Sequence, residues 1–270
     1  MSGVDAGALA LSVGATLGAA LVVMLIAFAV GLRTGRHRGV DVAWGLAFGA
    51  MALTGYACSA GHGDPGRRLL ATVLVLVWGL RLSAHIWWRS RGADEDPRYD
   101  RMLSRAPGSR DAYALRTVYL LQAAIAWFVS LPVQVAQQLP HPPGPLAWTG
   151  AGLWAVGLFF EAVGDAQLTR FKADPANRGT VMDRGLWRYT RHPNYFGDAC
   201  VWWGLFLLAA GSPIGWATVL SPLVMTYLLV NGSGKPMLER QLSSTKPGWA
   251  EYVARTSGFV PLPPRRHRGA

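Results

Sequence analysis

Long stretches without charge are the most prominent pattern along the chain. No Asp, Glu, Lys or Arg occurs in residues 6–32, 42–63, 117–160 or 199–234. Apolar runs of this length are typical of membrane-spanning helices. Charged residues make up only 15% of the chain, whereas about 25% is usual for a soluble domain. The pattern therefore disfavours a soluble enzyme, a disordered chain and a secreted disulfide-bonded scaffold.

These runs predict seven spans. Single spans are expected at residues 6–32, 42–60 and 69–88, the last interrupted by Arg81 and His85. The run 117–160 would be about 66 Å long as one helix, roughly twice the 30 Å hydrocarbon core, so it must form two spans. The run 199–234 is divided at residues 211–213, and its first span is short unless it begins near Pro193. We therefore predict an all-α polytopic membrane protein with seven transmembrane helices, in a single membrane domain of residues 1–270.

The distribution of Lys and Arg predicts the orientation of these spans. The connections after the first, third and fifth spans, together with the tail, hold 23 basic residues, whereas the opposite side holds only Arg67 and Arg68. Because basic connections stay in the cytoplasm, we expect the N-terminus outside and the C-terminus in the cytoplasm. The net charge of +11 then follows from topology. The lipid bilayer is the expected partner, and nucleic acid is not.

Two features argue against common soluble cofactor sites. Cys58 and Cys200 are the only cysteines, so a Cys-rich zinc or iron–sulfur site is absent and we expect no metal. Residues 232–235 resemble part of a phosphate loop, but Leu229 and Pro236 replace its first Gly and its Ser or Thr. A cofactor site would have to be built between helices.

Two polar clusters lie where spans meet the cytoplasmic side. Glu161, Asp165 and Lys172 follow helical spacing at the end of the fifth span, so they share one face. This face could bind a polar ligand, or its carboxylates could merely form ion pairs with arginines of the loop.

The second cluster is the segment 185–198. Pro193 suits the first turn of a helix, and Asn194 and Asp198 would then lie one turn apart on one face. Nearby Arg188, Arg191 and His192 favour a phosphate group. The Asn and Asp could instead act only as helix caps.

At this segment the sequence resembles a known family. Residues 190–198, Thr-Arg-His-Pro-Asn-Tyr-Phe-Gly-Asp, are similar to the C-terminal signature of the steroid 5-alpha-reductase and sterol-reductase superfamily. Residues 41–45, 78–82, 95–99, 234–239 and 252–261 resemble further motifs of its bacterial branch, the DUF1295 family. The resemblance covers most of the chain, and the combination of motifs is more specific than any one of them.

The resemblance implies a reductase of a bacterial cytoplasmic membrane, which takes NADPH from the cytoplasm and a hydrophobic small molecule or lipid from the bilayer. The four helices of residues 8–139 would form the substrate side, and residues 146–261 the cofactor side. Asn194 and Asp198 would hold the nicotinamide end, while Arg98, Lys172, Arg191 and the basic residues of the tail would hold the phosphates. Glu161 stands where the steroid enzymes carry Asn. The full set of implied cofactor-binding residues is Arg98, Tyr99, Asp165, Lys172, Tyr189, Arg191, His192, Asn194, Tyr195, Asp198, Glu239, Tyr252 and Arg255.

Two other functions stay open at this stage. Isoprenylcysteine carboxyl methyltransferases belong to the same superfamily, share Arg-His-Pro-x-Tyr and bind S-adenosylmethionine. Asp198 favours the reductases, and so does Glu239, which is followed by Arg240 rather than a second Glu. A non-catalytic lipid-binding membrane protein is the third alternative.

The candidate residues for binding the substrate are ionisable and lie in the second and third spans. His85 lies one turn from Arg81 and falls near a site tyrosine of the steroid enzymes, while Asp41 falls near their substrate-binding Glu. Hydride addition to a conjugated alkene needs a group that donates a proton or a hydrogen bond, and His85 titrates near neutrality. We therefore expect Asp41 and His85 to be catalytic. The alternative is that Asp41 only pairs with Arg81 to neutralise it in the membrane.

Overall fold

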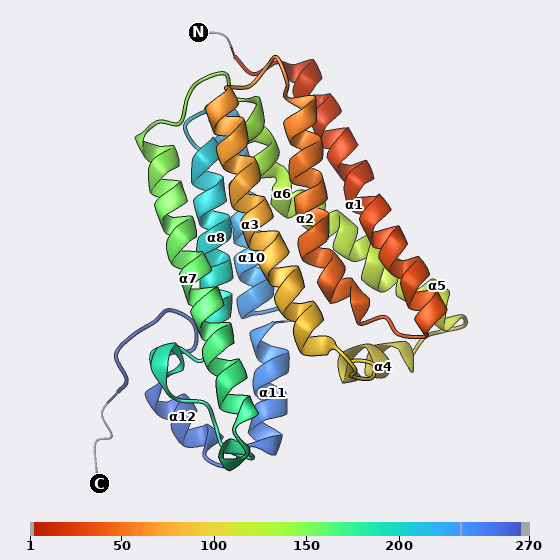
Figure 1. Cartoon of the computed structure of the whole chain (residues 1–270), viewed down its shortest axis with the longest axis vertical. Coiled ribbons are helices and arrows are strands. Elements are labelled where there is room, and N and C mark those ends of the chain that lie inside the picture. The colour runs from red at the N-terminus through yellow and green to blue at the C-terminus, as the bar shows by residue number, and fades with distance from the viewer. Residues whose placement is uncertain (1–2, 233, 266–270) are drawn as a thin grey trace. The chain divides into compact units, whose positions relative to one another are not determined.

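The fold is helical throughout, as the sequence predicts. A computed structural model describes residues 3–232 and 234–265, and within them the only β feature is an isolated bridge between Thr190 and Ser257. Figure 1 shows the helices. The α-helices are α1 Ala6–Thr34, α2 Gly39–Cys58, α3 Pro65–Ser90, α4 Pro97–Leu103, α5 Arg110–Ala114, α6 Leu121–Gln138, α7 Pro145–Ala173, α8 Pro193–Ala209, α9 Pro213–Trp216, α10 Leu220–Val230, α11 Lys235–Thr245 and α12 Trp249–Arg255. The π-helix η1 Leu115–Leu120 precedes α6, and 3-10 helices occur at η2 Pro175–Asn177, η3 Gly185–Arg188 and η4 Ala217–Val219.

The protein is an integral membrane protein with multiple candidate transmembrane helices. Six helical segments of the described chain are long and apolar enough to cross a bilayer: Ala6–Thr34, Gly39–Cys58, Pro65–Ser90, Arg110–Gln138, Pro145–Ala173 and Pro213–Thr245. The sequence predicts seven. The segment outside this set is α8, which begins at Pro193 but has only 17 residues, because the break at residues 210–212 ends it.

The chain folds into two compact units. Unit 1 comprises Met1–Trp148 and Leu208–Ser221, and unit 2 comprises Thr149–Leu207 and Pro222–Ala270.

Unit 1 is built on four helices, α1, α2, α3 and α6, which pack against one another (Figure 1). The backbones of α2 and α3 approach closely, because a Cβ on Gly45 would lie 2.4 Å from the carbonyl oxygen of Gly79. Trp78 fills the space beside this crossing and packs edge-on against Phe48 at a centroid distance of 5.4 Å. Small residues at a helix crossing let the two backbones come into van der Waals contact. This matters in a membrane, because the hydrophobic effect contributes little to the association of helices within lipid.

Arg67, near the start of α3, is buried in unit 1 although it carries a charge. Its Nε donates to the carbonyl of His141 at 2.9 Å and its Nη2 to that of Pro142 at 2.8 Å. Its Nη1 donates to the carbonyl of Leu208, in the last turn of α8. The last carbonyls of a helix have no partner within it, so Arg67 both caps a helix end and fastens the connection before α7.

Unit 2 is organised by a second glycine-lined contact, between α7 and α8. A Cβ on Gly157 would lie 2.5 Å from the carbonyl oxygen of Gly197, and a Cβ on Gly204 would lie 2.5 Å from that of Gly150. A Cβ on Gly164 would lie 3.2 Å from Pro193. Residue numbers rise along one helix as they fall along the other, so α7 and α8 are antiparallel and in close contact over several turns.

Candidate functional site

A charged cluster in unit 2 surrounds the Arg-His-Pro motif that precedes α8. Nε2 of His192 and Nε of Arg191 each lie 2.9 Å from Oε1 of Glu239, on α11. Tyr195 stacks on the His192 ring at 5.2 Å with an interplanar angle of 4°. Burial lowers the pKa of His192, and the opposing effect of Glu239 does not restore it. A neutral imidazole beside one glutamate and one arginine is the state this geometry favours.

Arg191 is fixed by the C-terminal tail. Its Nη1 donates to the carbonyls of Thr256 at 2.7 Å and Val253 at 3.2 Å, and its backbone N–H donates to Ser257 at 2.9 Å. Thr190 reinforces this contact, because its hydroxyl donates to the carbonyl of Phe259 at 2.7 Å. The tail thus supplies the acceptors that orient the guanidinium.

Gly258 lies where two cationic groups converge. A Cβ on Gly258 would lie 2.7 Å from Nζ of Lys235 and 3.1 Å from Nη2 of Arg191. With His192 neutral, Glu239 offsets only one of these two charges. We call Arg191, Lys235 and Gly258 the anion cradle, since Arg and Lys donors converging on one point suit a phosphate or carboxylate. The missing Cβ lets both cations approach the backbone of Gly258.

The polar side chains predicted on the fifth and sixth spans lie on α7 and α8 where these helices face each other. Glu161 is 3% exposed and Asp165 is 9% exposed, although both are carboxylates. A Cβ on Gly197 would lie 2.9 Å from Cγ of Glu161, and the Asn194 nitrogen is 3.7 Å from the corresponding point on Gly164. Asp165 and Asn194 therefore lie at one level of the facing helices, and Asp198 lies about one turn further along α8, at the level of Glu161. That these side chains bind a ligand stays a prediction. Lys172 lies two turns further along α7.

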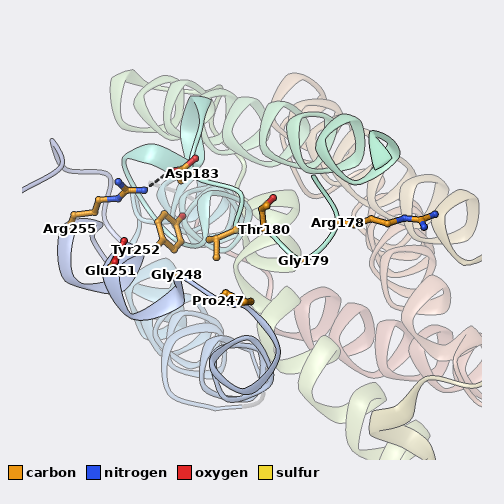
Figure 2. A pocket seen from close by; sticks show the side chains of 10 residues that line it. Arg178, Gly179, Thr180, Asp183, Pro247, Gly248, Glu251, Tyr252 and Arg255 are labelled. Carbon is orange, nitrogen blue, oxygen red and sulfur yellow. Dashed lines mark hydrogen bonds and ion pairs between the residues drawn. The ribbon is translucent and has the colours of Figure 1, made fainter. Parts of the chain in front are cut away.

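A pocket of about 420 Å³ lies beside this region in unit 2 (Figure 2). It is lined by Arg178, Gly179, Thr180, Val181, Asp183, Pro247, Gly248, Glu251, Tyr252 and Arg255. Tyr252 contributes its ring, because its hydroxyl donates to the carbonyl of Trp187 at 2.5 Å; burial raises its pKa. Arg255 forms an ion pair with Asp183, drawn as a dashed line in Figure 2.

The sequence predicts Tyr252 and Arg255 as site residues but not the loop that completes this pocket. Arg178 and Thr180 come from that loop, in which Gly179 adopts a positive φ of 81°. Their only signal in the sequence is a basic residue next to a glycine, which is common in surface loops.

A second polar cluster surrounds Asp41 at the start of α2 in unit 1. Tyr99 donates to Oδ1 of Asp41 at 2.6 Å, and Arg98 donates to Oδ2 at 2.8 Å. Burial and, to a smaller extent, the negative charge of Asp41 raise the pKa of Tyr99. Burial alone would raise the pKa of Asp96, but hydrogen bonds from Arg98 hold it below its usual value. Arg98 and Tyr99, which the sequence groups with the cofactor residues, thus bind the carboxylate of Asp41.

His85 lies near the end of α3, half-buried, with its ring centroid 6.5 Å from that of Trp88. The hydroxyl of Ser83 donates to the carbonyl of Val42 at 2.8 Å. This contact places Asp41 and His85 at the same end of the α2–α3 pair. Whether they line one pocket stays a prediction.

Sequence reasoning missed a third cluster in unit 1, centred on His37. Its Nδ1 lies 3.0 Å from the hydroxyl of Tyr119, and its Nε2 lies 3.6 Å from Asp111. Glu95 accepts the backbone N–H groups of His37 and Arg38. Tyr119 is in the π-helix η1, a rare conformation that tertiary packing imposes, so no local pattern marks it.

None of the described residues forms a group of three or more His, Cys, Asp or Glu side chains that could hold a metal ion. The polar groups near the site are cations, amides and carboxylates, and the cations suit an organic ligand with anionic groups.

Comparison with known proteins identifies the family. The family model described as "Protein of unknown function (DUF1295)" matches residues 27–256. The chain is also 29% identical over 204 residues to the Bos taurus protein 3-oxo-5-alpha-steroid 4-dehydrogenase 1, a match that covers 70% of this chain and 74% of that protein. No solved structure matches the chain. The match of the family model over most of the chain confirms the resemblance seen in the motifs, and this integral membrane protein belongs to the DUF1295 family.

Proposed function

We propose that this protein is an NADPH-dependent membrane reductase that saturates a carbon–carbon double bond in a steroid-like or other lipid substrate. The anion cradle is the observation that carries the proposal, because two cations converge beside Gly258, which has no Cβ to displace them, in a segment that resembles a motif of the family. The similarity to 3-oxo-5-alpha-steroid 4-dehydrogenase 1 favours an oxidoreductase and a conjugated ketone as the reacting group.

The residues of unit 2 fit the cofactor. Arg191 and Lys235, with Lys172, would bind its phosphate groups, and the buried Nδ1 of His192 can accept a hydrogen bond, since it makes none with a described residue. Asn194 and Asp198 would bind the carboxamide and ribose at the nicotinamide end, with Asp165 facing them from α7. The remaining contacts would come from Tyr189, Tyr195, Glu239, Tyr252 and Arg255. Bound NADPH would supply the hydride.

The substrate side would be unit 1. The reaction adds a hydride to one carbon of the double bond and a proton to its neighbour, so the protein must bind a carbonyl that gains negative charge and must deliver one proton. His85 is proposed as the donor and Asp41 as a group that binds the substrate. Tyr99 and Arg98 would set the charge and position of Asp41, since both donate to its carboxylate.

In the membrane, α8 would complete the predicted set of seven spans, as the sixth in chain order. It pairs antiparallel with α7, and its 17 residues rise about 26 Å, close to a 30 Å hydrocarbon core. The excess of Lys and Arg supports an N-terminus outside and cofactor residues on the cytoplasmic side, and the substrate would enter from the bilayer.

A pair of glycine variants tests the cofactor assignment. Gly258→Ala places a methyl group at the centre of the anion cradle, and NADPH affinity should fall at least about tenfold, or 1.4 kcal/mol. The matched control is Gly152→Ala on α7, where a Cβ would have nothing within 4 Å. Affinity is measured from the fluorescence of NADPH added to purified protein in nanodiscs.

Turnover is tested with testosterone, a steroid with a conjugated ketone, by following the loss of its ultraviolet absorbance in the presence of NADPH. Equal NADPH affinity in the two glycine variants would contradict the cradle assignment. Binding of S-adenosylmethionine but not NADPH by the unmodified protein would replace the reductase with a methyltransferase. Binding of neither, with testosterone retained, would indicate a lipid-binding protein without turnover.

A further inference from the structure

An exposed apolar patch lies on the segment that carries the Arg-His-Pro motif and on the tail bound to it. Tyr189 is 43% exposed, Val260 is 52% exposed and Leu262 is 54% exposed. They are held together, because the backbone N–H of Leu262 donates to the carbonyl of Tyr189 at 3.0 Å. We call these three residues the tail patch. Large apolar side chains fixed side by side at a protein surface need a partner that covers them.

The depth of this patch follows from its contacts with α7. Nε1 of Trp187 donates to the carbonyl of Gly164 at 3.0 Å, and Pro193 lies against the same glycine. From Pro145, where α7 begins, the helix rises about 29 Å to Gly164, close to the thickness of the hydrocarbon core. The chain on both sides of Tyr189 is thus tied to the level at which α7 leaves the hydrocarbon, which is the headgroup region.

The charges around the tail patch fit that region. Arg184, Arg188 and Arg265 are exposed and lie within five residues along the chain of Tyr189 or Leu262. Aromatic and aliphatic side chains flanked by arginines are typical of segments that lie in the interface plane of a membrane. A soluble partner protein would have to approach the same surface against the bilayer.

The tail that bears the patch also builds the anion cradle. Val253, Thr256 and Ser257 accept hydrogen bonds from Arg191, and Gly258 is the residue beside which Arg191 and Lys235 converge. Val260 and Leu262 follow directly in the chain. Fixing them at the membrane surface restricts the segment that positions Arg191.

We propose that the tail patch docks on the lipid headgroup region and thereby holds the anion cradle in its binding geometry. The docking is independent of what the protein catalyses, whereas its link to nucleotide affinity rests on the proposed function. The bilayer is then a part of the cofactor site, and the protein should bind nucleotide better in lipid than in detergent.

Depth-dependent quenching tests the docking. Leu262→Cys and, as control, Ser243→Cys are made in a chain with Cys58→Ser and Cys200→Ala and labelled with an environment-sensitive fluorophore. Ser243 is exposed on α11, about 12 Å beyond the start of that helix. In vesicles of phosphatidylcholine and phosphatidylglycerol with brominated acyl chains, the label at 262 should be quenched and the label at 243 should not. Absence of quenching at 262 overturns the docking, and so does shielding of that label by a second copy of the chain.

The double variant Val260→Ser with Leu262→Ser tests the link to the cradle. Its NADPH affinity should be about tenfold lower than that of the unmodified protein in nanodiscs and equal to it in detergent micelles. Equal affinity in nanodiscs, with quenching at 262 intact, overturns the link. If the unmodified protein binds no NADPH in either setting, the proposed function fails, and the quenching result still decides the docking.

Discussion

Replacing Arg67 by methionine should destabilise unit 1 more than the same replacement of any other arginine on α3. The variant Arg67→Met keeps the length and the apolar stem of the side chain but removes every donor. Arg67 is 6% exposed and donates to three backbone carbonyls, of His141, Pro142 and Leu208. Each carbonyl left without a donor costs about 1–3 kcal/mol, but the variant also relieves the burial of a charge, so we expect a net loss of about 3 kcal/mol.

The measurement is unfolding of the reconstituted protein by sodium dodecyl sulfate, followed by far-ultraviolet circular dichroism. Arg89→Met is the matched control, because Arg89 is exposed in the last turn of the same helix. Arg67→Lys should fall between the two, since one ammonium group cannot reach three carbonyls in the plane of a guanidinium. Equal stability of the two methionine variants would refute the reasoning, because it would mean that the three carbonyls find other donors at no cost.

Three further predictions concern packing, pH and topology. Gly45→Ala should lower the free energy of unfolding by about 1–3 kcal/mol, because the new Cβ would lie 2.4 Å from the carbonyl oxygen of Gly79. The control Gly14→Ala, whose Cβ would have nothing within 4 Å, should leave stability unchanged or raise it, and unfolding in sodium dodecyl sulfate compares the two variants. Burial lowers the pKa of His192 below its usual value of 6.5, so the unfolded chain binds more protons than the folded protein. Stability should therefore fall as pH drops below about 6.5, and a smaller fall in His192→Gln, seen in melting temperatures against pH, would identify the residue. Reporter fusions after Ala270 and within residues 61–65 should lie on opposite sides of the membrane, and reporters on the same side would contradict the proposed span count and orientation.

The helices could be predicted from the sequence because their signals are local. Charge-free runs mark the spans, and a proline, as at Pro65, Pro145 or Pro193, marks a start where it occupies the first turn. The one structural disagreement, α8, follows from length alone: its start was expected, but the break after Ala209 leaves 17 residues.

The site could be predicted only in part, because its contacts join distant segments. The motif around Arg191 and His192 was visible, but nothing near it in the sequence marks Gly258 or Lys235 as its neighbours. The hydrogen bond between Tyr99 and Asp41, which spans 58 residues, likewise has no local signal in the sequence. Long-range pairs of this kind depend on how helices pack, which composition and periodicity do not encode.

The fastening of the tail to the start of α8 has a consequence for the order in which the protein matures. Thr190 bonds to Phe259, 69 residues later, so α7 and α8 leave the ribosome well before the segment that binds them exists. Glu239 becomes available to Arg191 once α11 has been made, and the carbonyls of Val253 and Thr256 follow later. The helices α7 and α8 can therefore be complete while the cluster is still open, and the cluster closes only after residues 253–259 have been synthesised and have folded back onto the start of α8.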